Sequence, residues 1–263
     1  MSPIPSYTPE QLTQATADWS TCIGKGGYGD VFAGKLSGQE VAVKRMNNAA
    51  GTSPVGHAAF EREMLVSQVL THDSVVPVIG FSQQGSSRCL VYPLHQGSLE
   101  DRLHRRGPAP VLRQAIRLRI AADLASTLQA MHAKGVVHGD VKAGNVLLTT
   151  ELRGLFTDFG QAHVQPELCE TSELQRPSER DTLARDAGAA GDSGAAATRP
   201  VETRNRCGTE GYRAPELEPG TAPTAASDIF SLGTLLLELL SGMQPMTGRG
   251  RPGLPETVHG RVL

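Results

Sequence analysis

The sequence predicts an α+β fold of two lobes, with a small β-rich lobe at the N-terminus and a larger, mainly helical lobe after it. Two observations carry this prediction. Short strand-like runs separated by turn residues dominate the chain as far as residue 92. Beyond that point, apolar residues recur at helical spacing over residues 111–133 and form a long apolar run over residues 228–240.

The composition narrows the class of protein before any motif is considered. The 263 residues suffice for one large domain or two lobes, and a formal net charge of −2 gives no basic field that would bind nucleic acid. The four cysteines are scattered without a CxxC pair, which fits a reducing compartment better than a disulfide framework or a zinc site. There is no signal-peptide pattern and no apolar run long enough to span a bilayer. We expect a cytoplasmic chain with no membrane segment, either free or as the intracellular part of a membrane-receptor complex.

The small lobe begins with a glycine-rich hairpin. Residues 23–44 alternate as strands do on either side of a Ser-Gly turn, and the glycines lie between two strands. Apolar residues at helical spacing then predict a helix over residues 60–70. Two further strands are predicted from the run VVPVIGF, at residues 75–81, and the run SRCLVY, at residues 87–92.

The large lobe begins with a short helix whose N-cap is Ser98. The amphipathic helix over residues 111–133 stops at a Lys-Gly pair, which is a common C-terminal signal. The run over residues 228–240 is apolar nearly all round, so we expect a helix buried inside the lobe. Residues 165–206 are rich in Ala, Gly, Ser, Thr and charge without periodicity, and we expect a flexible insertion there.

The glycines of the hairpin form a G-x-G-x-x-G pattern at Gly24, Gly26 and Gly29. A dinucleotide-binding loop would lead from a strand into a helix, whereas this loop leads from one strand into another. Because glycine lets the backbone approach a ligand closely, such a loop can fold over phosphates. Taken alone, however, the pattern fits a flexible hairpin better than a binding loop.

A lysine and a nearby acid follow the glycine loop. Lys44 ends the strand-like run VAVK, where its ammonium group can meet phosphate oxygens from below. Such a lysine needs an acid to hold it, and the next helix offers Glu61 and Glu63. We prefer Glu63 because FEREM matches an F-x-x-E-[IM] pattern with the acid in fourth place, and Glu61 remains the alternative.

The stretch HGDVKAGNVLL, at residues 138–148, sets an acid, a base and an amide in front of a strand-like run. Asp140, Lys142 and Asn145 can face one small volume if the backbone forms an irregular loop, although a surface turn would show the same spacing. The stretches TDFG, which contains Asp158, and GTEGYRAPE follow later in the chain. These stretches come in a consistent order with fitting flanks, which favours an active site over a surface turn.

In this order, the glycine loop, VAVK, FEREM, HGDVKAGNVLL, TDFG and APE resemble the eukaryotic-type protein kinase family over nearly the whole chain. YTPEQLTQATADWS, CLVYPLHQGSLEDRLH and HGD resemble the branch of Pelle, the interleukin-1-receptor-associated kinases and the plant receptor-like kinases. The resemblance implies an N-terminal extension over residues 1–19, a kinase N-lobe over residues 20–92 and a kinase C-lobe over residues 93–263. The flexible insertion, at about 165–206, would lie inside the activation segment.

The resemblance also implies an ATP- and Mg²⁺-dependent protein serine/threonine kinase in receptor-linked signalling, which transfers the γ-phosphoryl group of ATP to a Ser or Thr hydroxyl of a protein substrate. Asp140 would orient or accept the hydroxyl proton. Lys44, oriented by Glu63, would bind the α- and β-phosphates, and the Mg²⁺ ligands would be Asn145 and Asp158. The other expected nucleotide contacts are Ile23, Gly24, Lys25, Gly26, Gly27, Tyr28, Gly29, Val31, Ala42, Tyr92, Leu94 and Leu147.

Two further features follow from the same resemblance. Lys142 is typical of serine/threonine kinases and belongs to the catalytic set, and Thr209 would contact both Lys142 and Asp140. Tyr92 would be the gatekeeper, and the hinge that follows it at residues 93–95 is one residue shorter than is usual in this branch.

Three features depart from the family's pattern. Gly139 stands where many kinases have an arginine that grips a phosphorylated activation segment. The activation segment is long, because the insertion lies within it. The chain also ends soon after the helix at residues 228–240, so we expect the C-lobe to be truncated. A pseudokinase or signalling scaffold that acts by binding proteins is therefore an alternative, although the complete catalytic set favours an active enzyme.

Three conspicuous residues have structural interpretations. We expect His138 to pack in the core of the loop that contains Asp140. We expect Asp228 to accept hydrogen bonds from the backbone of that loop. Trp19 is expected to pack the N-terminal extension onto the small lobe.

Overall fold

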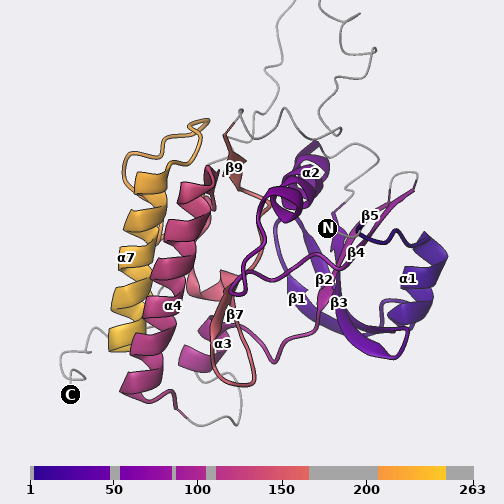
Figure 1. The fold of residues 1–263 in the computed structure, drawn as a ribbon, viewed down its shortest axis with the longest axis horizontal. Coiled ribbons are helices and arrows are strands. Elements are labelled where there is room, and N and C mark those ends of the chain that lie inside the picture. Colours follow the sequence, from indigo (N-terminus) through magenta and orange to yellow (C-terminus); the bar gives the residue numbers. More distant parts are fainter. Residues whose placement is uncertain (1–2, 48–53, 85–86, 105–110, 166–206, 247–263) are drawn as a thin grey trace, which may run out of the picture.

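The computed structural model describes residues 3–47, 54–84, 87–104, 111–165 and 207–246. Figure 1 shows two lobes, with the sheet and α1 on the right and the paired helices α4 and α7 on the left. Helix α2 lies between them at the top of the view. The predicted α+β architecture of a β-rich lobe followed by a helical lobe is therefore confirmed.

The small lobe is built on a five-stranded antiparallel sheet in the order β1-β2-β3-β5-β4. Ser37 and Gly38, at φ 49° and 84°, form the turn between β2 and β3, and positive φ at both positions suits a tight hairpin. The glycine loop connects β1 to β2, as predicted. The strands are β1 (Cys22–Lys25), β2 (Gly29–Leu36), β3 (Gln39–Met46), β4 (Gly80–Gln84) and β5 (Ser87–Pro93).

The strand predicted over residues 75–81 is wrong for most of its length, because β4 begins only at Gly80. Pro77 has no N–H to donate to a ladder. The backbone N–H of Val76 instead donates to the carbonyl oxygen of Phe156 in the large lobe, at 2.9 Å. The run is apolar because it packs where the lobes meet, while β4 continues into polar residues that the apolar pattern does not mark.

The N-terminal residues extend the small lobe. The N–H of Tyr7 donates to the carbonyl of Phe81 in β4 at 2.8 Å, and helix α1 (Pro9–Ala15) buries Leu12 completely against the outer face of the sheet. Trp19 meets Phe32 edge-on at 5.2 Å, and the guanidinium of Arg45 lies 4.6 Å from the Trp19 ring. The predicted packing of Trp19 is confirmed.

Helix α2 (Pro54–Val69) contacts both cores and begins earlier than the predicted residue 60. Phe60 and Met64 pack in the small-lobe cluster, whereas Val66 packs in the large-lobe core. The helix therefore depends on both lobes for its burial, and its position is sensitive to how they meet.

The core of the large lobe lies between two long helices. Helix α3 (Leu99–Leu103) begins at the predicted N-cap Ser98, and α4 (Gln114–Ala133) starts three residues later than predicted and stops before Gly135. Side chains from α4 pack against the inner face of α7 (Ala225–Ser241). The short elements of this lobe are β6 (Val136–Val137), η2 (Ala143–Asn145), β7 (Val146–Leu148), β8 (Gly154–Phe156) and β9 (His163–Val164), with β6 paired to β9 and β7 paired to β8.

The expectation that the helix at residues 228–240 is buried all round is wrong. Leu232, Leu235 and Leu239 are buried, but Ile229 and Leu237 are 55% and 69% exposed. Apolar composition marks both faces of α7 alike, and only the inner face meets α4. The insertion expected at 165–206 lies outside the described residues except for its first residue. No helix in the described ranges has both the length and the apolarity needed to cross a membrane.

Candidate active site

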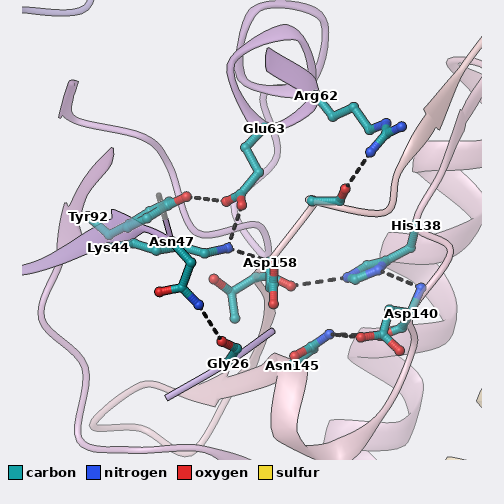
Figure 2. A network of polar contacts seen from close by, with 12 residues as sticks. Gly26, Lys44, Asn47, Arg62, Glu63, Tyr92, His138, Asp140, Asn145 and Asp158 are labelled. Atoms are coloured by element: carbon teal, nitrogen blue, oxygen red, sulfur yellow. Dashed lines mark hydrogen bonds and ion pairs between the residues drawn. The ribbon is translucent and has the colours of Figure 1, made fainter. Parts of the chain in front are cut away.

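A buried ion cluster joins elements from both lobes. Lys44 of β3 places its Nζ 2.5 Å from Oε1 of Glu63 in α2 and 2.7 Å from Oδ1 of Asp158, which follows β8 (Figure 2). The Lys44 and Glu63 side chains are 8% and 2% exposed, and that of Asp158 is 32% exposed. We call these three residues the Lys44 cluster. Because each comes from a different element, the cluster forms only when all three elements are docked.

The alternation of β3 explains why Lys44 faces this cluster. Successive side chains of a strand point to opposite faces of the sheet. Val41 and Val43 pack in the outer cluster beneath α1, while Ala42 and Met46 pack in the inner cluster beside α2. Lys44 lies between Ala42 and Met46 on the inner side, so its ammonium group reaches the carboxylate from α2.

The charges of the cluster are set by burial and by proximity. Burial alone would lower the pKa of Lys44, but the carboxylates of Asp158 and Glu63 outweigh it and raise the pKa above its ordinary value. Burial raises the pKa of Glu63 even though Lys44 opposes the shift. Burial would also raise the pKa of Asp158, but Lys44 outweighs it and the pKa is lowered. Lys44 is thus a cation and Asp158 an anion at neutral pH.

Tyr92 adds a neutral donor to the cluster. Its hydroxyl donates to Oε2 of Glu63, so both oxygens of this carboxylate are engaged (Figure 2). Burial and the nearby Glu63 raise the pKa of Tyr92 well above its ordinary value, and the hydroxyl keeps its proton. The position of Tyr92 was predicted from the sequence, but no signal there indicates this bond.

The choice between the two glutamates of α2 is decided by exposure. The Glu61 side chain is 62% exposed and lies 3.1 Å from Nδ1 of His57, one turn away on the same helix. Glu63 faces inward and bonds Lys44. The predicted pairing of Lys44 with Glu63 is confirmed, and the alternative Glu61 is excluded from the cluster.

The second part of the site is the Asp140 loop, which we define as residues 138–145. Asn145 Nδ2 donates to the backbone oxygen of Asp140 at 2.9 Å and to its Oδ2 at 3.0 Å. Lys142 Nζ lies 2.8 Å from the same Oδ2. Thr209 donates to Asp140 Oδ1 at 2.7 Å and accepts from Lys142 Nζ at 2.7 Å. The expected contact of Thr209 with both residues is confirmed, and the Asp140 carboxylate is held at both oxygens.

Helix α7 supplies a support beneath this loop. Asp228 is buried and accepts from the backbone N–H of His138 at 2.7 Å, from that of Gly139 at 2.9 Å and from His132 Nε2 at 2.9 Å. His138 is fully buried and stacks near Phe159, with 4.8 Å between ring centroids. The structural interpretations of Asp228 and His138 are confirmed.

The glycine loop is held close to the end of β3. Gly26 donates its backbone N–H to Gly29, and the side-chain amide of Asn47 donates to the Gly26 carbonyl at 3.3 Å (Figure 2). A Cβ on Gly29 would come 2.4 Å from the carbonyl oxygen of Arg45, so β2 can approach β3 here only without a side chain. The glycine loop is therefore fixed at its base, where β2 lies against the end of β3.

The comparisons with known proteins agree with this geometry. The family model of the protein kinase domain matches residues 19–179, which is more than half of the chain. The chain belongs to the protein kinase family.

Three relatives illustrate the branch. The Nodulation receptor kinase of Pisum sativum is 33% identical over 250 residues, covering 92% of this chain and 24% of the relative. Serine/threonine-protein kinase BIK1 of Arabidopsis thaliana is 32% identical over 277 residues, covering 98% of this chain and 61% of the relative. PTI1-like tyrosine-protein kinase 3 of the same plant is 32% identical over 256 residues, covering 92% and 55%. The predicted resemblance to plant receptor-like kinases is confirmed, and the chain spans between 24% and 61% of the length of these relatives.

The remaining kinase positions lie around the glycine loop and the hinge. Ala42 and Leu147 come from opposite lobes and pack against the same cluster as Tyr92. Val31 is paired with Gly24 in the β1–β2 ladder, and Ile23, next to Gly24, is 49% exposed. At the hinge, Leu94 donates its N–H to the carbonyl of Glu40 in β3 at 3.4 Å. The other predicted contacts, Lys25, Gly27 and Tyr28, lie at the tip of the glycine loop.

The oxygen groups nearest the cluster could serve a hard cation. Asn145 uses its amide nitrogen toward Asp140, which leaves the amide oxygen as the group for a cation. Carboxylate and amide oxygens are ligands that Mg²⁺ accepts. In the part of the chain that the structure describes, no group of three or more His, Cys, Asp or Glu side chains is arranged around one metal position.

Sequence reasoning missed two residues that touch the kinase site. Asn47 holds the glycine loop, and Arg62 of α2 donates to the carbonyl of Gly160 at 3.1 Å (Figure 2). Both are polar residues, for which solvent exposure is the ordinary expectation. Their partners are backbone carbonyls, which a sequence does not mark.

Proposed function

We propose that this chain is an ATP- and Mg²⁺-dependent protein serine/threonine kinase that transfers the γ-phosphoryl group of ATP to a Ser or Thr hydroxyl of a protein substrate. The observation that carries the proposal is the Lys44 cluster. A buried lysine is fixed by Glu63 of α2 and by Asp158 in one orientation beside a glycine loop. A preorganised cation of this kind is suited to phosphate oxygens whose charge changes during transfer.

Each part of the site has a role in this proposal. Lys44 contacts the α- and β-phosphates, and the backbone of the glycine loop covers them. Asn145 and Asp158 would hold Mg²⁺, which neutralises phosphate charge when it is bound. Asp140 receives or orients the proton of the acceptor hydroxyl, because its carboxylate is held in place by Asn145, Lys142 and Thr209.

The preference for Ser or Thr is supported by Lys142 and its contact with Thr209. The names of the relatives do not distinguish a Ser/Thr acceptor from a Tyr acceptor, because one of them is named a tyrosine-protein kinase. The pseudokinase alternative finds no support, since Lys44, Glu63 and Asp158 are assembled and the Asp140 loop is complete within the described residues. By relation to the named receptor kinase, we place the activity in receptor-linked signalling inside the cell.

The test is phosphoryl transfer by the purified chain. With ATP labelled in the γ-phosphoryl group and Mg²⁺, we expect label on a mixture of Ser/Thr peptides and much less on matched Tyr peptides. EDTA should abolish the transfer, and a thermal-shift scan should show stabilisation by ATP with Mg²⁺. Stabilisation by ATP with Mg²⁺ but no phosphoryl transfer would contradict the enzymatic proposal and would favour the pseudokinase or scaffold alternative.

A further inference from the structure

The activation segment of this chain has two described ends, residues 158–165 and 207–216, and one side chain ties them together. The backbone N–H of Gly208 donates to Oε1 of Gln161 at 2.7 Å, across 47 positions of sequence. Gln161 is half-buried and follows directly on the stretch that contains Asp158. We infer that Gln161 is a positioning residue, which sets the place of Thr209 beside Asp140 through this bond. The inference rests on the proposed kinase function.

The peptide groups around Gly208 are held at two points. Arg213 Nη2 donates to the carbonyl oxygen of Gly208 at 2.7 Å, while Gln161 receives the N–H. Gly208 has φ +82°, a conformation that glycine adopts without strain and other residues rarely do. With its donor and its acceptor both bonded, this glycine is fixed, and the next residue along the chain is Thr209.

The hydrogen bond between Gln161 and Gly208 controls the position of Thr209. Thr209 donates to Oδ1 of Asp140 and accepts from Nζ of Lys142, each at 2.7 Å. A loss of the Gln161 bond leaves the N–H of Gly208 without its partner and frees the start of this stretch to move. Asp140 would then lose a donor, although neither Gln161 nor Gly208 touches it.

The hydrogen bond between Gln161 and Gly208 involves no charged group. Gly139, in the Asp140 loop, explains how the backbone of Gln161 can come close enough to form it. A Cβ on Gly139 would lie 2.5 Å from the carbonyl oxygen of Gln161 and 3.0 Å from Pro223, and Gly139 itself has φ +78°. The missing side chain at Gly139 lets the backbone of Gln161 lie against the Asp140 loop. The amide of Gln161 therefore joins the two ends of the segment where an arginine and a phosphate would do so in many kinases.

The experiment compares two substitutions of similar length. Gln161→Met removes the acceptor, whereas Gln161→Glu keeps an acceptor oxygen at the same distance along the side chain. Gln83→Met, on the exposed end of β4, is the matched control. We expect kcat/KM for a Ser/Thr peptide to fall about tenfold in Gln161→Met, a typical loss for one partly buried hydrogen bond. The KM for ATP should change less than about twofold, and Gln161→Glu should recover most of the loss.

A second readout does not depend on activity. Amide hydrogen exchange of the Gly208 N–H should be slow in the parent chain and in Gln161→Glu, and about tenfold faster in Gln161→Met. Unchanged exchange and unchanged peptide kcat/KM in Gln161→Met would overturn the inference. An equal fall for ATP and peptide would also overturn it, because it would indicate a general loss of structure. If the parent chain transfers no phosphate but the exchange pattern holds, the kinase proposal fails and the tie itself stands.

Discussion

The Lys44 cluster and the Asp140 loop are two halves of one site, and they are held in different ways. Lys44 is 19 and 114 positions from its two acidic partners, whereas Asn145 lies 5 positions from Asp140. The cluster consists of buried charges from three separate elements. The loop combines hydrogen bonds within residues 138–145 with two long-range supports, one from Thr209, 69 positions from Asp140, and one from Asp228 of α7. The comparison teaches that every bond of the first half depends on the docking of α2 and the lobes, while the second half is assembled partly by its own sequence and partly by Thr209 and α7.

The largest effect is expected from a substitution that removes the cation of the Lys44 cluster. Lys44→Met should lower phosphoryl transfer by about 10²–10³-fold, because it removes the positive group that we propose binds the phosphates. Circular dichroism should show the fold retained, and Lys35→Met on the exposed side of β2 should behave as the parent chain. Unchanged turnover in Lys44→Met would remove the basis for assigning a role to the cluster.

The next prediction compares an acid inside the Lys44 cluster, Asp158, with an acid outside it, Glu61. Asp158→Asn should lower Mg²⁺-dependent transfer by about a hundredfold, since the carboxylate that we propose as a Mg²⁺ ligand loses its charge. Glu61→Gln alters an exposed side chain and should change the rate less than about twofold. Transfer rates measured over a series of Mg²⁺ concentrations test this. A worse lesion in Glu61→Gln would reverse the assignment of the α2 acid.

Thr209→Val probes the second half. It removes the donor to Asp140 and the acceptor for Lys142, so we expect kcat for a Ser/Thr peptide to fall about tenfold. Thr209→Ser keeps the hydroxyl and should retain most of the activity. If Val and Ser variants were equally active, the hydroxyl would have no part in holding the Asp140 carboxylate.

Tyr92→Phe should change stability more than chemistry. The hydroxyl donates to Glu63, and its loss should cost about 1 kcal/mol of unfolding free energy at neutral pH. Burial raises the pKa of Glu63 above its ordinary value of 4.5. The folded state therefore loses stability as the pH rises from 4.5 through the raised pKa of Glu63. The Tyr92 hydroxyl stabilises the ionised form of Glu63. The difference in unfolding free energy between Tyr92→Phe and the parent chain should therefore shrink as the pH falls toward 4.5.

Denaturant unfolding at several pH values measures this difference. Tyr7→Phe, on the far side of the sheet, is the control and should show a smaller and pH-independent change. A Tyr92→Phe difference that grows on acidification would contradict the role of Tyr92 as donor to a carboxylate.

The smallest expected effect concerns phosphate on the activation segment. Gly139 offers no cation, and the described ends of the segment are tied by the neutral amide of Gln161. Phosphatase treatment should therefore change the transfer rate by no more than a few-fold. A loss of a hundredfold, about 2.7 kcal/mol of barrier, would show that a phosphate helps to hold the Asp140 half.

Much of the fold and of the site could be predicted because the signals are local. The Ser-Gly hairpin turn, the N-cap at Ser98 and the spacing of Asp140, Lys142 and Asn145 each depend on residues within a few positions. The prediction over residues 75–81 failed because an apolar run packs equally well in a sheet or where two lobes meet, and Pro77 settles the matter against a strand. The burial of α7 was overestimated because composition does not say which face meets a neighbour.

The sequence by itself determined the order of the motifs, the two-lobed class and the identity of nearly every polar group in the site. Tertiary structure alone decided that Tyr92 would donate to Glu63, that Asn47 would hold Gly26, and that Gln161 would tie Gly208. The physical reason is that a hydrogen bond forms only when the folded chain brings donor and acceptor to the right distance and angle. Across tens of positions, that depends on the packing of whole elements, and no local pattern in the chain records it.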